Sequence, residues 1–253
     1  MEISTADWLA YKDKMASLDR QAAELIAKWV EKNGLSDIPA LIAYCFAVAT
    51  KYSEGSGALA AAMYDTIAEL SGLYLEPAEV AETPTYDDVS KTVYGILGQA
   101  IALEVLTGAI GRLVKRTGAD TMLKNAKRDG AFIAWIPMGD TCAFCLGLAA
   151  EGWRHVGKDM VKNGHASHIH SNCDCTYGVK FNEATTYDAY NPDVYKQIYD
   201  SAEGSTPKMK INSMRRAFYA ANSEEINDQK RDAYEKRKER ESSKAEEVDI
   251  VPG

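Results

Sequence analysis

The chain has 253 residues, of which 46% are hydrophobic, so it can bury a substantial core in one domain or in two. Its formal net charge of −8 argues against a general nucleic-acid-binding protein. The charge is uneven: residues 1–90 carry 15 acids and 6 bases (−9), residues 91–180 carry 7 and 11 (+4), and residues 181–253 carry 15 and 12 (−3). Any contact with a polyanion is therefore expected in the central third of the chain.

The first predicted element is a long amphipathic helix. Ser4 and Asp7 match a capping box, and apolar residues recur at every third or fourth position over residues 8–29. Asn33 and Gly34 are expected to end the helix. The apolar seam packs into the protein's own domain in one interpretation, and against a second subunit of a homo-oligomer in the other.

Two further helices are expected before residue 73. Ser36 is predicted to cap the first of them, which tolerates Pro39 in its first turn and is largely apolar. The glycines and serines of residues 53–57 are expected to break it, so that a separate helix covers residues 58–70. Residues 73–88, with two prolines and several acids, are predicted to be an irregular crossing segment.

From Ser90 a single long helix is predicted. Its stretch 92–111 contains one charged residue, Glu104, and is long enough to cross a bilayer. Gln99 and Glu104 lie inside it, however, and a charge at the bilayer centre costs at least about 2.5 kcal/mol. We therefore expect a buried helix in a bundle, and no membrane partner.

A basic patch follows in residues 112–128. It consists of Arg112, Lys115, Arg116, Lys124, Lys127 and Arg128. Cations near the C-terminal end of a helix are commonly solvated, and they interact favourably with the helix dipole. The alternative is a contact with phosphate, such as packaged DNA, or with an acidic protein.

Two short aromatic and β-branched runs, residues 131–135 and 176–181, are predicted to be strands. They flank two clusters of cysteines, so pairing the strands would bring the clusters together. Asp140 or Thr141 is expected to cap a short helix that carries Cys145. His155 and His165, in the loop of residues 152–167, are expected at the surface.

The two clusters supply five candidate metal ligands: Cys142, Cys145, His170, Cys173 and Cys175. A CxxC pair followed by a second cluster of thiols and an imidazole is typical of a tetrahedral structural zinc site, and five ligands compete for four places. Disulfides are not expected, because residues 1–10 lack a secretory signal. A redox CxxC pair usually follows a strand in a βαβ unit and brings no second cluster.

The C-terminal third is predicted to be helical and then highly charged. Tyrosines at positions 187, 190, 195 and 199 suggest one helical stretch, and residues 211–221 suggest an amphipathic helix. Residues 223–247 carry 9 acids and 7 bases and form either a solvated helix or a disordered tail.

The expected fold is therefore mainly α. Residues 1–129 form a helical body, residues 130–181 a small zinc-stapled α+β module with a short strand pair, residues 182–222 the C-terminal helices, and residues 223–253 a charged tail. Zn²⁺ would have a structural role, because thiolate-rich sites leave no position open for water or substrate.

The segments WIPMGDTCAFC (135–145) and HSNCDC (170–175) resemble the minor head proteins of tailed bacteriophages, the MuF-type head morphogenesis family. The shared pattern is an aromatic strand, a D-x-C-x-x-C knuckle and an H-x-N-C-x-C cluster, and it covers about residues 130–181. Cys142, Cys145, His170, Cys173 and Cys175 match this motif, whereas His168 is an addition. The resemblance implies a non-enzymatic minor structural protein of the virion, made in the host cytoplasm, which associates with portal and capsid proteins and acts in head assembly or genome delivery.

Two alternatives use the same residues. In a zinc-dependent nuclease, His168 or His170 would polarise water; a deaminase would need a glutamate two residues after a zinc histidine, and neither histidine has one. A zinc-finger DNA-binding protein is favoured only by the basic patch.

Overall fold

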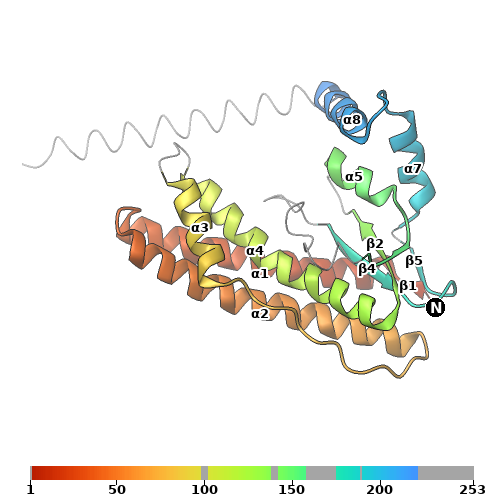
Figure 1. Ribbon diagram of the computed structural model, residues 1–253, viewed down its shortest axis with the longest axis horizontal. Helices are drawn as coiled ribbons and strands as arrows, with labels where there is room; N and C mark the ends of the chain where they lie inside the picture. The colour runs from red at the N-terminus through yellow and green to blue at the C-terminus, as the bar shows by residue number, and fades with distance from the viewer. Residues whose placement is uncertain (1, 98–101, 138–141, 158–174, 189, 222–253) are drawn as a thin grey trace, which may run out of the picture. The chain divides into compact units, whose positions relative to one another are not determined.

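A computed structural model describes residues 2–97, 102–137, 142–157, 175–188 and 190–221. The chain divides into two compact units, Met1–Ile198 and Tyr199–Gly253. The described residues are mainly helical, with a few short strands, which confirms the predicted fold class in its coarse form (Figure 1).

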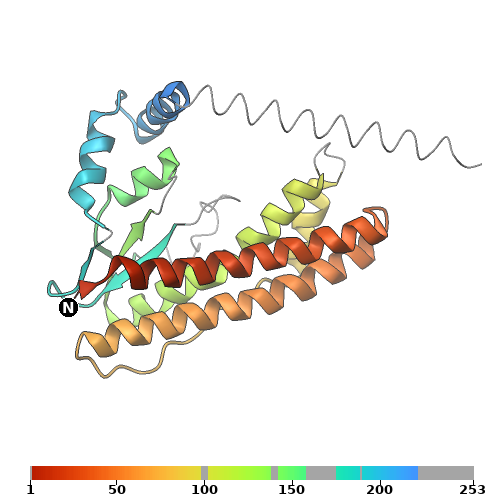
Figure 2. The ribbon, with the colours of Figure 1, turned by 180° about the vertical axis from the view of Figure 1, so that it is seen from behind.

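The first helix has the ends that the sequence predicts. Helix α1 (Thr5–Asn33) follows Ser4, whose side chain accepts a hydrogen bond from the Asp7 N–H at 3.1 Å, and Gly34 ends it with φ of 73°. Its apolar seam, from Trp8 to Val30, is buried within the first unit, in agreement with the first of the two interpretations. Figure 2 shows α1 running alongside α2 (Ile38–Leu70).

Helix α2 is a single helix of 33 residues, so the predicted break at residues 53–57 is wrong. A methyl group in place of a hydrogen on Gly57 would lie 2.3 Å from Val80 and 3.2 Å from Thr117, and one on Gly55 would lie 3.4 Å from Leu18. The glycines thus permit close packing, and that packing outweighs their low helix propensity. The N-cap is Asp37, one residue later than predicted.

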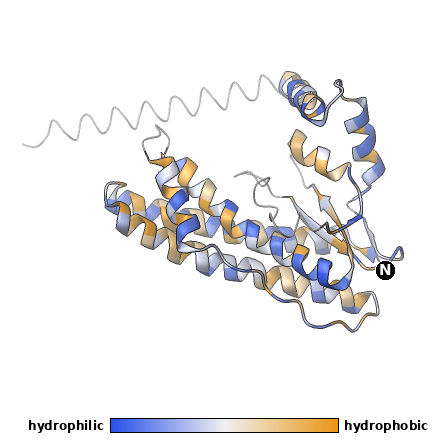
Figure 3. Cartoon of the chain, viewed as in Figure 1, coloured by the Kyte–Doolittle hydropathy of each residue, from blue (hydrophilic) through white to orange (hydrophobic). Residues whose placement is uncertain are grey.

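The predicted long helix from Ser90 is also wrong, because the structure has two helices there. Helix α3 (Tyr86–Ile96) begins with a capping box of Thr85 and Asp88, and it ends at Leu97, whose ψ of 131° is extended. Helix α4 (Ala102–Asp129) then continues through the whole basic patch. Figure 3 shows the hydrophilic C-terminal end of α4. None of the described helices is both long and apolar enough to cross a membrane.

An extended strap, residues 73–84, joins α2 to α3 and is held by side chains of α4. Asn125 accepts a hydrogen bond from the Glu79 N–H at 2.9 Å and donates one to the Glu79 carbonyl at 2.8 Å. The Thr121 hydroxyl accepts a bond from the Ala81 N–H at 3.0 Å. These side chains take the place of a neighbouring strand, so the predicted irregular segment has a defined path.

The strands form two small sheets. Strand β2 (Phe132–Ile136) is the centre of a three-stranded antiparallel sheet, with β3 (Arg154–His155) on one side and β4 (Thr176–Lys180) on the other. The pairing of β2 with β4 confirms the predicted strand pair. Strand β1 (Glu2–Ile3) pairs in parallel with β5 (Thr186–Tyr187), which brings the start of the chain to the sheet region.

The helical body and the sheet share one hydrophobic core. This core contains Trp8 of α1, Tyr64 of α2 and Met122 of α4 together with Ile133 of β2 and Val179 of β4. A second cluster lies further along α1 to α4 and includes only helical residues. The segments 1–129 and 130–181, predicted as body and module, therefore pack against each other within the first unit.

Two helices follow within the described residues 190–221. Helix α7 (Pro192–Ser201) carries Tyr195 and Tyr199, whereas Tyr187 lies in β5 and Tyr190 precedes the helix, which corrects the predicted tyrosine-lined helix. In the second unit, α8 (Pro207–Ala221) confirms the helix predicted at residues 211–221 and begins four residues earlier. The charged tail, residues 223–253, lies outside the described residues.

Candidate metal centre

Two of the predicted ligands stand at the start of helix α5 (Ala143–Ala149). Cys142 is the N-cap residue, and its sulfur accepts a hydrogen bond from the Cys145 N–H at 3.5 Å. Cys142 thus does the capping expected of Asp140 or Thr141, which lie outside the described residues. The thiolate is the form of cysteine that binds metal.

The third described ligand, Cys175, stands directly before β4. In the ladder Ile136, the last residue of β2, pairs with Thr176, the first of β4. The chain therefore leaves β2 towards Cys142 and enters β4 through Cys175 at the same end of the sheet. Cys142 and Cys175 both pack against the hydrophobic cluster that contains Cys145, as pairing of the strands predicts.

Among the described residues, no disulfide joins Cys142, Cys145 and Cys175, and Cys145 is only 1% exposed. His170 and Cys173, as well as His165 and His168, lie outside the described residues. Within the described part of the chain, no group of three or more possible ligands is close enough to hold a metal ion. The described donors suit zinc in chemical type, and the bound metal and the choice of four ligands stay predictions.

His155 lies at the opposite end of the sheet from the thiols. It is exposed, as predicted, and its ring packs on Phe132 at a centroid distance of 4.1 Å. In the ladder it pairs with Phe132, the first residue of β2, whereas the cysteines follow the last. Four steps of about 3.3 Å separate the two ends of the strand. His155 is thus no ligand for the thiol cluster.

Sequence reasoning missed the residue that closes the outer edge of β4, near the end of that strand. The Tyr187 hydroxyl donates a hydrogen bond to the Val179 carbonyl at 2.7 Å and accepts one from the Val179 N–H at 3.0 Å. Strand β4 is an edge strand, so these backbone groups would otherwise lack a partner. Burial raises the pKa of Tyr187, which keeps the hydroxyl protonated as the donor.

Two more tyrosines hold the thiol-bearing elements. The Tyr190 hydroxyl donates a hydrogen bond to the Ala149 carbonyl at the end of α5, at 2.7 Å. Tyr195 and Cys175 both pack against the same hydrophobic cluster, and burial raises the pKa of Tyr195. The spacing of the tyrosines suggested a helical face, and the sequence contains no signal for these contacts.

The cations of the basic patch are largely engaged within the protein. Lys115 pairs with Asp19, Arg116 with Asp120, Lys124 with Glu79 and Arg128 with Asp129, all at 2.7 to 3.2 Å. Lys127 donates to the Val156 carbonyl at 3.2 Å. The hydrogen bond from Arg128 lowers the pKa of Asp129, so this pair is charged at neutral pH. The patch therefore has much less free positive charge than the sequence suggests.

Fold and thiols together define a mainly helical protein with a small sheet packed against its helices and cysteines in the segments next to that sheet. The chain belongs to the VG15 protein family, whose model matches residues 2–202. This family is one of viral proteins, in agreement with the phage origin that the motif resemblance implies. The match runs from β1 to the end of α7, so it includes both the helices and the cysteines. No curated protein and no solved structure matches the chain.

Proposed function

We propose that this protein is a minor structural protein of a phage head, associated with the portal vertex and acting in head assembly or genome delivery. The observation that carries the proposal is the cysteine motif of the MuF-type head proteins, found in a member of a viral family. The proposal is supported by the positions of Cys142 after β2 and Cys175 before β4, because Ile136 and Thr176 pair at that end of the sheet.

Zinc in this protein would be structural. Four of the five candidates Cys142, Cys145, His170, Cys173 and Cys175 would hold it, and the metal would supply a closed cross-link between α5 and the segment before β4. The protein's own side chains already position both elements, through Tyr190 at the end of α5 and Tyr187 at β4. Zinc would then fix the segment between the two halves of the motif.

Protein partners are favoured over packaged DNA. Binding to a duplex depends on cations that neutralise several phosphates, and at least four cations of the basic patch already pair with carboxylates of this chain. We therefore propose portal and capsid proteins as partners, and no catalytic role.

The proposal is tested on particles of the virus that encodes the protein. Mass spectrometry of purified virions should detect the chain in few copies, and cryo-electron microscopy without imposed symmetry should place it at the portal vertex. A null mutant should yield empty, misassembled or non-infectious heads. A chain that is abundant in infected cells but absent from both procapsids and virions would overturn the proposal.

A further inference from the structure

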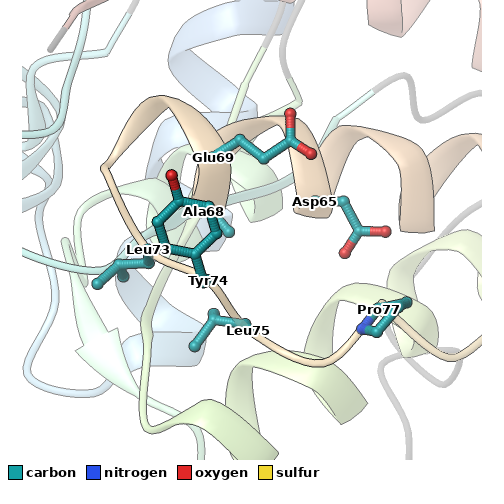
Figure 4. A pocket seen from close by; sticks show the side chains of 7 residues that line it. All are labelled: Asp65, Ala68, Glu69, Leu73, Tyr74, Leu75 and Pro77. Atoms are coloured by element: carbon teal, nitrogen blue, oxygen red, sulfur yellow. The ribbon is translucent and has the colours of Figure 1, made fainter.

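A pocket of about 170 Å³ lies where α2 ends and the strap begins. Two acidic residues from the last turns of α2, Asp65 and Glu69, line it and lie one helical turn apart (Figure 4). Its other wall is apolar and comes from the strap, through Leu73, Leu75 and Pro77. We call it the α2 pocket.

The walls of the α2 pocket are fixed in position. The Asp65 carboxylate accepts a hydrogen bond from the Ala78 N–H at 2.8 Å. Arg128 of α4 donates to the Pro77 carbonyl at 3.0 Å and to the Glu76 carbonyl at 2.7 Å. A site that is formed before its ligand arrives loses less conformational entropy on binding.

The electrostatics of the α2 pocket favour a cation. The C-terminal end of a helix has partial negative charge, which basic side chains usually balance, yet the last turn of α2 has no basic residue. Glu69 adds a full negative charge there. Neither Glu69 nor Asp65 forms an ion pair with another described residue, in contrast to Asp19, Glu79 and Asp129.

The surface around the α2 pocket is suited to contact with a protein. Tyr74, which lines it, is 101% exposed, and the neighbouring Leu70 is 56% exposed. An exposed tyrosine next to aliphatic residues is typical of the centre of a protein interface, and its ring also attracts a cation.

We propose that the α2 pocket docks a lysine or arginine side chain of a protein partner, with the aliphatic stem against Leu75 and Pro77 and the charged head between Asp65 and Glu69. The two carboxylates repel nucleic acids and anionic membranes. This contact is separate from the thiol cluster and does not depend on zinc. It defines a second surface of the protein, formed by α2 and the strap.

The test uses the full-length ¹⁵N-labelled protein and the peptide acetyl-Ala-Arg-Ala-amide. Saturable shifts are expected at the backbone amides of residues 69–75, with weaker binding at high salt, because salt screens exposed charges. The citrulline peptide, which has nearly the same shape without the charge, should bind at least severalfold more weakly. Glu69→Gln should weaken arginine binding roughly threefold, as expected for one exposed ion pair.

The matched control is Glu24→Gln, an exposed acid on α1 outside the pocket, which should leave binding unchanged. Tyr74→Ser tests whether the tyrosine ring contributes to arginine binding. Urea unfolding of each variant checks that the fold is intact. Absence of saturable shifts at residues 69–75, equal shifts with the citrulline peptide, or an equal effect of the two glutamine variants would each overturn the proposal.

Discussion

Asp19 of α1 and Lys115 of α4 form an ion pair of 2.7 Å, and the Asp19 carboxylate lies directly over Gly111. The side chains of the pair are only 18% and 11% exposed. A Cβ at position 111 would lie 1.7 Å from the nearer Asp19 oxygen. Gly111 therefore provides the space that the ion pair needs, and the three residues together fix the register of α1 on α4.

Gly111→Ala is expected to destabilise the protein, although alanine is the better helix former by about 1 kcal/mol. The added methyl group displaces Asp19 and separates a mostly buried ion pair, so the free energy of unfolding should fall by about 1–3 kcal/mol. Urea unfolding followed by circular dichroism measures the change.

The control for this prediction is a double-mutant cycle with Asp19→Ala. Once the carboxylate is removed, Gly111→Ala no longer meets it and should be neutral or stabilising by up to about 1 kcal/mol. Additive effects of the two substitutions would show that Asp19 is not the reason for the glycine.

Cys142→Ser distinguishes the predicted metal-binding role of Cys142 from its role as a helix cap. Serine is a good N-cap residue, so the start of α5 should be kept while a zinc ligand is lost. We expect about one zinc per chain in the native protein and reduced zinc content in the variant, by elemental analysis. Hydrogen exchange should become faster in α5 and β4.

The control is Cys45→Ala, which removes a fully buried thiol from the helical cluster. This variant should lose global stability but keep its zinc. Protein purified under reducing conditions without metal, and with exchange that a chelator does not change, would rule out the zinc site.

Asn125→Ala is expected to release the strap. The substitution removes both hydrogen bonds to the backbone of Glu79, and each partly buried group left without a partner costs about 1–3 kcal/mol. The amide of Glu79 should lose protection from hydrogen exchange. Lys124→Ala, which breaks only the exposed ion pair with Glu79, should have a much smaller effect on stability. Equal effects would show that charge, not backbone pairing, holds the strap.

Cys45 should contribute to unfolding at alkaline pH. Burial raises the pKa of its thiol from 9.0 to about 12, so between these values the unfolded chain loses a proton that the native protein keeps. The unfolded state then binds fewer protons, and stability falls as pH rises through this range. Cys45→Ala should be less sensitive to pH between about 9 and 12, as measured by urea unfolding. An unchanged pH dependence would contradict this assignment.

The amino-acid sequence alone determined those features that depend on neighbouring residues. Ser4 and Gly34 define the ends of α1 because caps and left-handed turns are local interactions. The aromatic and β-branched runs at residues 131–135 and 176–181 identified the strand pair, β2 and β4. The position of the cysteines beside both strands then indicated that Cys142 and Cys175 lie at one end of the sheet.

Only the tertiary structure decided those features in which long-range contacts outweigh local preference. Gly57 does not break α2, because Val80 and Thr117 pack closely against it from segments distant in sequence. The basic patch is mostly neutralised for the same kind of reason, since Asp19 and Glu79 reach it from α1 and the strap. Periodicity along one chain contains no information about which carboxylate meets which cation, because that pairing depends on how the helices pack together.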